Sequence, residues 1–423
     1  MLKENNIALK YGDRKIEFQI AEKNIIDTLH ANQIEPLKEP SNRLEQLLEK
    51  PINSPSLEQL IREKKAQKIS IIVNDVTRPT PYQVLLPPLL KKLEASGVKK
   101  ENIIFLIATG AHRGNTREEN IKTFGEELVS SYQFVNHSCD DEGLIDLGEL
   151  KSGNRLLVNP IVEQIDFIIT TGVIVPHYIA GFSGGRKSIL PGICGRETIE
   201  KNHAFMVHPK AATGNLEGNP VQEEMTEAIG KVKVDFNINV VTDEDGNIVD
   251  IVAGELIASW LQGVEVCKNT YLCPIKEKAD AVFTSAGGYP KDINIYQAQK
   301  ALDNAYQAVK PGGTIALLAE CREGIGNSIC QQWIEEARSI EDIEARLKKR
   351  FVLGGHKAYA IAKVAKEVEI ILISSLHKKL VQKMFMIPAN GIQDALTLVQ
   401  KKHGSNFNCY IIPNGSVVLP QIK

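Results

Sequence analysis

The stretch DFIITTGVIVPHY, residues 166–178, is an apolar run that ends in a proline and a histidine. Two similar runs occur earlier in the chain, KISIIVNDVTRPTP (68–81) and NIIFLIATGAHRG (102–114). Short runs rich in Ile and Val that end in small or polar residues are typical of buried strands followed by loops. Residues 82–97, between the first two runs, have the amphipathic spacing of a helix despite a pair of prolines. This alternation predicts an α/β fold with a mostly parallel sheet.

The alternation starts again in the C-terminal part of the chain. A polar passage at 240–255 predicts a hairpin that turns at Asp245 and Gly246, since Asp-Gly favours a two-residue turn. Beyond it, residues 279–292 and 367–376 resemble strands, and residues 295–313 have helical spacing. The sequence therefore predicts a second α/β unit.

We place the domain boundary within residues 268–278. The prediction is an N-terminal α/β domain over residues 1–272 and a smaller C-terminal α/β domain over residues 273–404, both with mostly parallel sheets. A last strand-like stretch within residues 405–423 is a candidate to complete the first domain. With 423 residues, 43% of them hydrophobic, the chain is large enough for two cores.

Composition restricts the kinds of partner. The formal net charge is -2, so no overall field draws the protein to nucleic acid or to an anionic membrane. No run approaches the roughly 20 apolar residues of a membrane span, and the amino terminus lacks the apolar core of a signal peptide. The seven cysteines are scattered and contain no C-x-x-C pair, which favours reduced thiols. We expect a cytoplasmic protein that acts on a small molecule.

The glycine-rich segment PHYIAGFSGGRKSILPGI, residues 176–193, contains a near match to a phosphate-binding loop. Gly181 to Ser188 fit the pattern G-x-x-x-x-G-K-S/T except at one position, where Arg186 replaces glycine. An arginine there restricts the backbone that would close around a phosphate. Lys187 is therefore predicted to act as an amine nucleophile or a covalent anchor, and not as the phosphate-binding lysine of a nucleoside triphosphatase.

Polar side chains follow each of the three predicted strands. Asp75 and Arg78 follow the first strand, and the planar donor fork of an arginine suits a carboxylate or a phosphate. An alternative is that Asp75 and Arg78 only pair with each other to brace their loop. His112 and His177 follow the second and third strands, where ligands bind in such sheets. Because histidine titrates near neutral pH, the two could flank one carbon as acid and base.

Two later segments contain further candidates. His203 and His208 are five residues apart, which disfavours a two-histidine zinc site on one helical face but allows a single soft-metal ligand. Tyr296 and Lys300 are four residues apart on a predicted helix and so share a face, with Gln297 between them.

These residues belong to five motifs that occur in a fixed order between about residues 70 and 305. The motifs are D-x-T-R-P, T-G-A-H-R, P-H-x-I-A-G-F-S-G-G-x-K, N-H and Y-Q-x-x-K. In this order they resemble the lactate racemase family. The resemblance implies a racemase of 2-hydroxy acids that uses a nickel-pincer nucleotide, a pyridinium-3-thioamide-5-thiocarboxylic acid mononucleotide whose sulfur-bearing arms hold Ni²⁺. It also implies enzymes that build this cofactor as partners, and an active site in the cleft between a cofactor-binding N-terminal domain and the C-terminal domain.

The resemblance also assigns a role to each candidate. Lys187 would bond to the cofactor through a thioamide, and His112 and His177 would exchange the proton of the substrate hydroxyl while the C2 hydride is transferred reversibly. The implied sets are, for catalysis, His112, His177, Arg78, Lys300 and Gln297; for cofactor binding, Lys187, Asp75, Gly184, Gly185 and Tyr296; and for the metal, His203.

One feature departs from the family. Its lactate racemases have a tryptophan of the second domain near the substrate, whereas Trp260 and Trp333 of this chain do not correspond to it. The candidate segment is GGHKAY, residues 354–359, where His356, Lys357 or Tyr359 could shape the pocket. A basic group there would suit a second carboxylate, such as that of malate. Two alternatives therefore stay open: an epimerase of longer hydroxy acids or sugar acids, and a non-catalytic protein that binds or delivers the nickel nucleotide.

Overall fold

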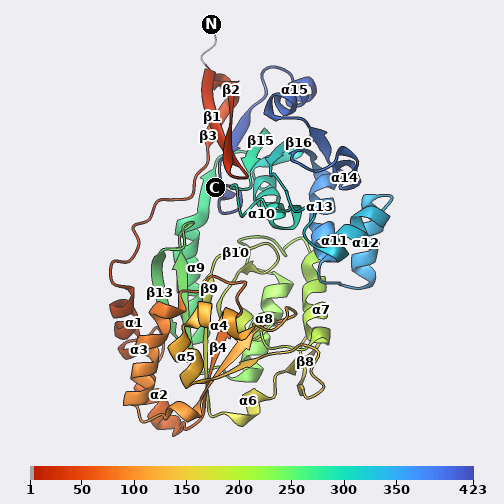
Figure 1. The fold of residues 1–423 in the computed structure, drawn as a ribbon. Coiled ribbons are helices and arrows are strands. Elements are labelled where there is room, and N and C mark those ends of the chain that lie inside the picture. Colours follow the sequence, from red (N-terminus) through yellow and green to blue (C-terminus); the bar gives the residue numbers. More distant parts are fainter. Residues whose placement is uncertain (1–3) are drawn as a thin grey trace. The chain divides into compact units, whose positions relative to one another are not determined.

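The computed structural model describes residues 4–423, which form two compact units (Figure 1). Unit 2 is one continuous segment, residues 33–270. Unit 1 combines two segments, residues 4–32 and residues 271–423. Each unit is an α/β layered structure with a six-stranded sheet, as the sequence predicts.

The sheet of unit 2 has the strand order β13-β12-β9-β4-β5-β6. All neighbouring pairs are parallel except β12 and β13, which are antiparallel. The three apolar runs of the sequence form the strands β4, β5 and β9, so these predictions are confirmed. The strands of this sheet are β4 (Ile69–Asn74), β5 (Ile103–Ala108), β6 (Gln133–Asn136), β9 (Phe167–Ile174), β12 (Phe236–Thr242) and β13 (Ile248–Gly254).

Helices flank this sheet in the pattern of a doubly wound fold. The amphipathic segment 82–97 forms α3 with Pro87 and Pro88 inside it, because the buried leucines around them compensate for the missing backbone hydrogen bonds. The helices of unit 2 are α1 (Pro40–Glu49), α2 (Leu57–Lys64), α3 (Tyr82–Ala95), α4 (Arg117–Phe124), α5 (Glu126–Ser131), α6 (Ile161–Gln164), α7 (Arg196–Ala204), α8 (Pro220–Val232) and α9 (Leu256–Tyr271). Two short antiparallel pairs, β7 (Ile145–Glu149) with β8 (Arg155–Val158) and β10 (Pro176–His177) with β11 (Gly181–Phe182), complete it.

The predicted hairpin at 240–255 is confirmed. Strands β12 and β13 pair up to Thr242 and Ile248, and the turn between them contains Gly246 with a φ of +89°. The Asp243 side chain accepts hydrogen bonds from the backbone N–H groups of Asp245 and Asn247, at 2.9 Å each. Glycine and the aspartate side chain thus supply what a tight turn needs.

The sheet of unit 1 is parallel throughout, with the strand order β18-β17-β16-β15-β19-β3. Its strands are β3 (Ile25–Thr28), β15 (Ala279–Ser285), β16 (Val309–Leu318), β17 (Glu369–Ile373), β18 (Ile387–Ala389) and β19 (Cys409–Ile412). Its helices are α10 (Ile295–Tyr306), α11 (Ser328–Glu336), α12 (Ile340–Lys349), α13 (Gly355–Glu367), α14 (Lys378–Lys383) and α15 (Ile392–His403). The hairpin of β1 (Glu4–Tyr11) and β2 (Arg14–Ala21) and the parallel pair β14 (Leu272–Ile275) and β20 (Leu419–Ile422) also belong to it.

The helical pattern at 295–313 is only partly a helix. Helix α10 ends at Tyr306, and β16 already begins at Val309, where it pairs with Ala279 of β15. The segment after Tyr306 contains Pro311, which cannot continue a helix and biases its neighbour toward an extended conformation.

The division of the chain differs from the predicted one at both termini. The predicted boundary at 272/273 lies close to the observed one at 270/271, but residues 4–32 belong to unit 1. Residues 405–423 do so too, because β19 lies between β15 and β3 in the sheet of that unit. Strand β19 is buried along its whole length and pairs with a strand on each side. The sequence pattern predicts such a strand but does not identify the two strands with which it pairs.

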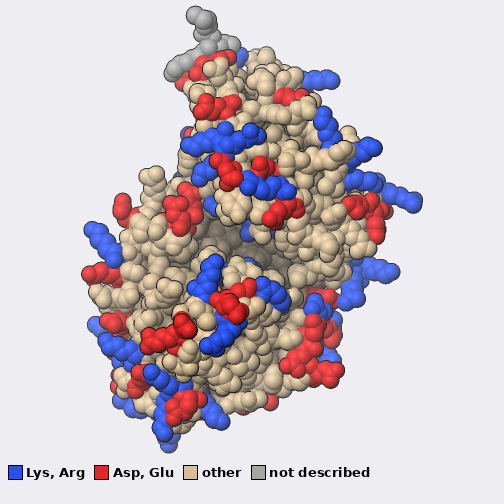
Figure 2. Space-filling view, viewed as in Figure 1, with Lys and Arg blue, Asp and Glu red and all other residues tan. Residues whose placement is uncertain are grey.

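Charges of both signs are mixed over the surface that Figure 2 shows, as the small net charge predicts. All seven cysteines are free thiols. Within residues 4–423 no helix combines the length and the apolarity needed to cross a bilayer.

Candidate active site

The candidate residues of unit 2 lie on three loops at one edge of its sheet. Strand β4 lies between β9 and β5, and the three strands are parallel. Their carboxyl ends therefore point to the same edge, where Asp75 and Arg78 follow β4, His112 follows β5 and His177 follows β9. The two histidines thus lie on either side of the loop after β4.

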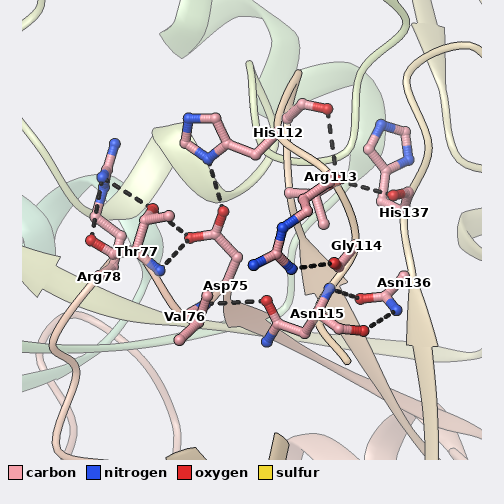
Figure 3. A network of polar contacts seen from close by, with 12 residues as sticks. Asp75, Val76, Thr77, Arg78, His112, Arg113, Gly114, Asn115, Asn136 and His137 are labelled. Atoms are coloured by element: carbon pink, nitrogen blue, oxygen red, sulfur yellow. Dashed lines mark hydrogen bonds and ion pairs between the residues drawn. The ribbon is translucent and has the colours of Figure 1, made fainter. Parts of the chain in front are cut away.

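Asp75 holds the ring of His112 by a short hydrogen bond (Figure 3). Its Oδ2 atom lies 2.7 Å from Nδ1 of His112, and Oδ1 accepts hydrogen bonds from the backbone N–H (3.1 Å) and the hydroxyl (2.6 Å) of Thr77. Burial favours the protonated form of Asp75, but the hydrogen bonds from His112 and Thr77 and the charges of His112 and Arg78 outweigh it and lower the pKa. The carboxylate thus places the proton of a neutral His112 on Nδ1, so that Nε2 is the atom available for proton exchange.

Arg78 is exposed and contacts its own loop. Its guanidinium donates to the hydroxyl of Thr77 at 3.1 Å, and the described contacts contain no ion pair between Arg78 and Asp75. The alternative in which these two residues only brace each other is therefore not observed. The position leaves the planar fork of Arg78 accessible from solvent.

Lys187 and His177 form the second pair of this site. Lys187 is half-buried in a 3₁₀ turn, Gly185–Ser188, and its Nζ lies 3.1 Å from Nε2 of His177. Burial, and then the charges of Arg78 and Arg186, lower the pKa of Lys187 well below its ordinary value. Nδ1 of His177 faces the backbone N–H groups of Ile179 (3.4 Å) and Ala180 (3.3 Å), so a neutral ring carries its proton on Nε2, toward the amine.

The two glycines before Lys187 allow the loop to pack tightly. Gly184 and Gly185 both have positive φ, +75° and +50°. A Cβ atom on Gly185 would lie 2.7 Å from the Trp260 ring, and the N–H of Gly185 donates to Oδ1 of Asn239 at 2.8 Å. The backbone N–H of Gly185, a residue that the resemblance assigns to cofactor binding, is therefore bonded within the protein.

Arg186, the residue that breaks the phosphate-loop pattern, braces this loop. Its guanidinium is fully buried and stacks on Trp260, with 3.8 Å between its Cζ atom and the ring centroid. It also donates to Oε1 of Gln222 (2.6 Å) and to the carbonyl oxygen of Ala180 (2.7 Å). Burial lowers the pKa of Arg186 to about 9. Arg186 thus has a structural role that a glycine could not fill.

His203 is buried on α7 as a neutral imidazole. Its Nδ1 lies 3.1 Å from the carbonyl oxygen of Ile199, which places the proton of the neutral ring on Nδ1 and a lone pair on Nε2. Burial, and then the charge of Lys187, lower its pKa to about 3. His208 lies beyond the helix and is exposed. Residues 4–423 contain no group of three or more His, Cys, Asp or Glu side chains arranged to hold a metal ion.

A buried polar network that the sequence analysis missed fixes α7. Nδ2 atoms of Asn202 (2.8 Å) and Asn154 (3.2 Å) both donate to Oε2 of Glu224 on α8. Asn202 directly precedes His203, so the network sets the position of that histidine. Asn239 was also missed. The available signal for it was that two asparagines, Asn237 and Asn239, interrupt the apolar strand FNINVVT.

The remaining candidates, Tyr296, Gln297 and Lys300, lie on α10 of unit 1. The helix begins after Asn294, whose side chain accepts from the N–H of Gln297 at 3.0 Å, and it carries Tyr296 and Lys300. His356, buried at the start of α13, meets Tyr296 edge to face with 6.2 Å between ring centroids.

Lys357 is also buried. Its Nζ donates to Oε1 of Gln299 at 2.6 Å and lies 5.4 Å from the centroid of the Tyr296 ring. Tyr359 is buried on the same helix. The segment 354–359 thus packs beside the Tyr296 motif. That these residues of unit 1 form a cleft together with the candidate residues of unit 2 stays a prediction.

Comparisons with known proteins identify the family. Residues 11–214 match the lactate racemase N-terminal domain family, and residues 275–419 match the lactate racemase C-terminal domain family. A lactate racemase of Thermoanaerobacterium thermosaccharolyticum is 35% identical over 428 residues, which cover 99% of this chain and 100% of that protein. A lactate racemase of Lactiplantibacillus plantarum is 34% identical over 98% of this chain and 99% of its own length.

Solved structures agree with this. The lactate racemase apoprotein of T. thermosaccharolyticum superposes with a TM-score of 0.91 at 34% identity, covering 99% of this chain and 100% of that one. A protein from Thermotoga maritima with 20% identity has a TM-score of 0.64 over 93% of this chain and 100% of its own, which shows a shared fold. Both family domains and full-length relatives match in the same order, and the chain belongs to the lactate racemase family.

Proposed function

We propose that the protein is a racemase that interconverts the enantiomers of a 2-hydroxy acid, with lactate as the first candidate substrate. The proposal rests on the placement of three loops at one sheet edge, where the loop of Arg78 lies between the loops of two histidines. In each histidine the contacts of the ring define which nitrogen can exchange a proton. The names of the full-length relatives support the same reaction.

The residues present fit a nickel-pincer nucleotide. Lys187 is an amine whose pKa is lowered by burial and neighbouring cations, which makes it suitable for a covalent bond to the cofactor. His203 is a neutral imidazole with a lone pair on Nε2, which suits nickel. When bound, the cofactor would supply the hydride chemistry at C2 of the substrate. Enzymes that build this nucleotide are the partners that the proposal requires.

We assign the substrate carboxylate to Arg78. Its exposed planar fork can donate two parallel hydrogen bonds to a carboxylate. Lys300 and Gln297 of unit 1 are proposed to bind the same substrate, with Tyr296 beside them. His356 and Lys357 pack against Tyr296 and are proposed to limit the size and polarity of the pocket.

The two histidines exchange the hydroxyl proton. A base on each side is needed because the hydroxyl groups of the two enantiomers point in opposite directions from the same carbon. Nε2 of His112 can take or return the proton while Asp75 stabilises the imidazolium through Nδ1. Nε2 of His177 serves the other enantiomer, and its neighbour Lys187 is the residue that would hold the cofactor. We infer that Asp75 positions His112 and does not bind the cofactor itself.

The test is enantiomer interconversion by protein produced together with the cofactor-building enzymes. Incubation with D-lactate or L-lactate alone, followed by chiral chromatography, should give both enantiomers. His112→Gln and His177→Gln should each lower kcat by roughly 10²–10⁴-fold, the range of a general acid–base residue. His208→Gln is the matched control because His208 is an exposed histidine outside the site.

Parallel incubations with malate and with longer hydroxy acids define the substrate. Faster turnover of malate than of lactate would assign the second carboxylate to the basic segment 354–359. Absence of turnover with every hydroxy acid, in protein shown to carry the cofactor, would contradict the proposed function.

A further inference from the structure

The pair of Lys187 and His177 has the properties of an imine-forming site. Imine formation requires an unprotonated amine, a proton donor for the carbonyl oxygen and a group that holds the ketone in place. In the described structure Nζ of Lys187 lies 3.1 Å from Nε2 of His177, so amine and proton donor are already in contact.

The surroundings of Lys187 favour the neutral amine. Burial and the charges of two guanidinium groups, Arg78 and Arg186, oppose its protonation. Arg186 cannot move away, because it is fully buried, stacked on Trp260 and bonded to Gln222. A desolvated lysine beside another cation is a recognised way to activate an amine nucleophile.

The third requirement is met by Arg78. It is exposed and follows β4, the strand adjacent to β9, after which His177 lies, and its charge contributes to the lowered pKa of the amine. An exposed guanidinium near a neutral amine favours a ketone that carries a carboxylate. Lys187 and His177 are themselves half-buried, and the inference requires that a small molecule bound by Arg78 reaches them.

We propose that the cofactor-free protein captures a 2-oxo acid as an imine on Lys187, with His177 as the proton-transfer group and Arg78 as the carboxylate binder. Nζ attacks the C2 carbonyl, and the carbonyl π electron pair moves to oxygen, which takes the proton of Nε2 of His177. The new C–N bond gives a carbinolamine, and the imidazole recovers the proton that nitrogen loses. Nε2 then protonates the departing hydroxyl, so that the C–O bond breaks, water leaves and a C=N bond forms, and the nitrogen returns its second proton to Nε2, which restores the neutral imidazole. No oxidant or reductant is consumed.

The imine would occupy the atom that is proposed to anchor the cofactor. While the imine exists, Nζ of Lys187 cannot react with another electrophile, so a high concentration of 2-oxo acid would protect it. Hydrolysis of the imine releases the amine again. This gives the cofactor-free enzyme a binding activity of its own, separate from racemisation.

The experiment uses full-length protein produced without the cofactor-building enzymes. The protein is incubated with pyruvate, then reduced with sodium borohydride, which converts an imine into a stable secondary amine. Intact mass spectrometry should show one added reduced pyruvate per chain, and peptide mapping of the native protein should locate it on Lys187. Lactate, which has no carbonyl at C2, should add no mass.

Three variants test the assigned roles. Lys187→Met should abolish the adduct, while Lys91→Met, at an exposed lysine of α3, should retain it. His177→Gln should slow adduct formation by roughly 10²-fold or more. Arg78→Gln should weaken labelling by pyruvate by about tenfold or more and leave labelling by acetone unchanged, because acetone has no carboxylate. Peptide mapping of the native protein decides the site even if Lys187→Met fails to fold.

Two results would overturn the inference: no adduct on native protein, or an adduct spread over surface lysines and unchanged by Lys187→Met. Its failure is distinct from failure of the racemase proposal. Racemisation by cofactor-loaded protein whose cofactor-free form traps no pyruvate would reject the imine alone. An imine on Lys187 in a protein that racemises nothing would support the imine and reject the racemase.

Discussion

At the scale of single residues, the chemistry of the site depends on which nitrogen of each histidine faces which partner. The sequence predicts histidines at the ends of β5 and β9, and the structure adds that Asp75 bonds Nδ1 of His112 while Lys187 faces Nε2 of His177. Nothing in a linear pattern reveals these pairings, because the partners are 37 and 10 residues apart and meet only in the folded chain. The sequence thus predicted the candidates but not the tautomers.

Replacement of Asp75 by Asn tests its positioning role. Asparagine can still accept a hydrogen bond from Nδ1 of His112 but carries no charge to stabilise the imidazolium. We expect Asp75→Asn to lower kcat for lactate racemisation by about 10–100-fold with little change in KM, and to shift the acid limb of the pH–rate profile. Steady-state kinetics over a range of pH checks this, with the exposed Asp141→Asn as control. A variant with unchanged kcat and pH profile would show that His112 does not need the carboxylate.

A third histidine, His137, gives a prediction for stability. It is buried, Nε2 lies 3.0 Å from the carbonyl oxygen of Cys194, and burial lowers its pKa below the ordinary value of 6.5. Below pH 6.5 the unfolded chain takes up a proton at this residue and the folded chain does not, so stability falls as the pH decreases. Urea unfolding at pH 7.5 and pH 5.5 should show this loss. His137→Gln should lose less between the two pH values, and an equal loss in both proteins would assign the pH dependence to other groups.

At the scale of elements, the position of β4 between β9 and β5 brings the three loops together. The apolar runs and their polar ends allowed this sheet edge to be predicted as the site. The packing of the loop from Gly181 to Ser188 was harder to predict, because the sequence identified Arg186 only as a departure from a phosphate-binding loop. In the structure Arg186 fills the interior of the loop, and Oδ1 of Asn239 accepts the hydrogen bond of the Gly185 N–H. Such side-chain packing depends on α8 and α9, which are distant in sequence.

The tight packing of this loop can be tested at Gly185. A Cβ atom there would lie 2.7 Å from Trp260, and the backbone has a φ of +50°. We expect Gly185→Ala to destabilise unit 2 by about 2 kcal/mol or more through strain and overpacking. Gly230→Ala is the control, since a Cβ on this exposed residue of α8 meets nothing within 4 Å, and we expect a gain of roughly 0.5 kcal/mol from helix propensity. Thermal unfolding of the two variants checks the difference, and equal melting temperatures would show that the loop adapts.

At the scale of the whole molecule, the chain builds unit 1 from both of its ends. Strand β3 near the amino terminus pairs with β19 near the carboxyl terminus, and the Asn24 side chain, also buried, donates to the carbonyl oxygen of Ser405 at 3.0 Å. The sequence predicted two α/β units and the break near residue 270, because both follow from local alternation of strands and helices. It did not predict which unit the termini join, because the residues of a strand do not identify the strand with which it pairs.

Removal of residues 1–28 tests this arrangement. The deletion removes the β1–β2 hairpin and β3, and it leaves an edge of β19 without its partner. We expect unit 1 to become sensitive to protease while the fragment 33–270 stays resistant. Limited proteolysis followed by mass spectrometry checks this, with full-length protein as control. Digestion of both units at the same rate would show that unit 2 also depends on the amino terminus.

The central claim is that Lys187 anchors the nickel nucleotide of a 2-hydroxy acid racemase. Intact mass spectrometry with peptide mapping, on protein produced with the cofactor-building enzymes, tests it most directly. We predict an added mass located on Lys187, present in the protein that racemises lactate and absent from Lys187→Met, which should be inactive. Full racemase activity in a protein whose Lys187 carries no added mass would contradict the claim.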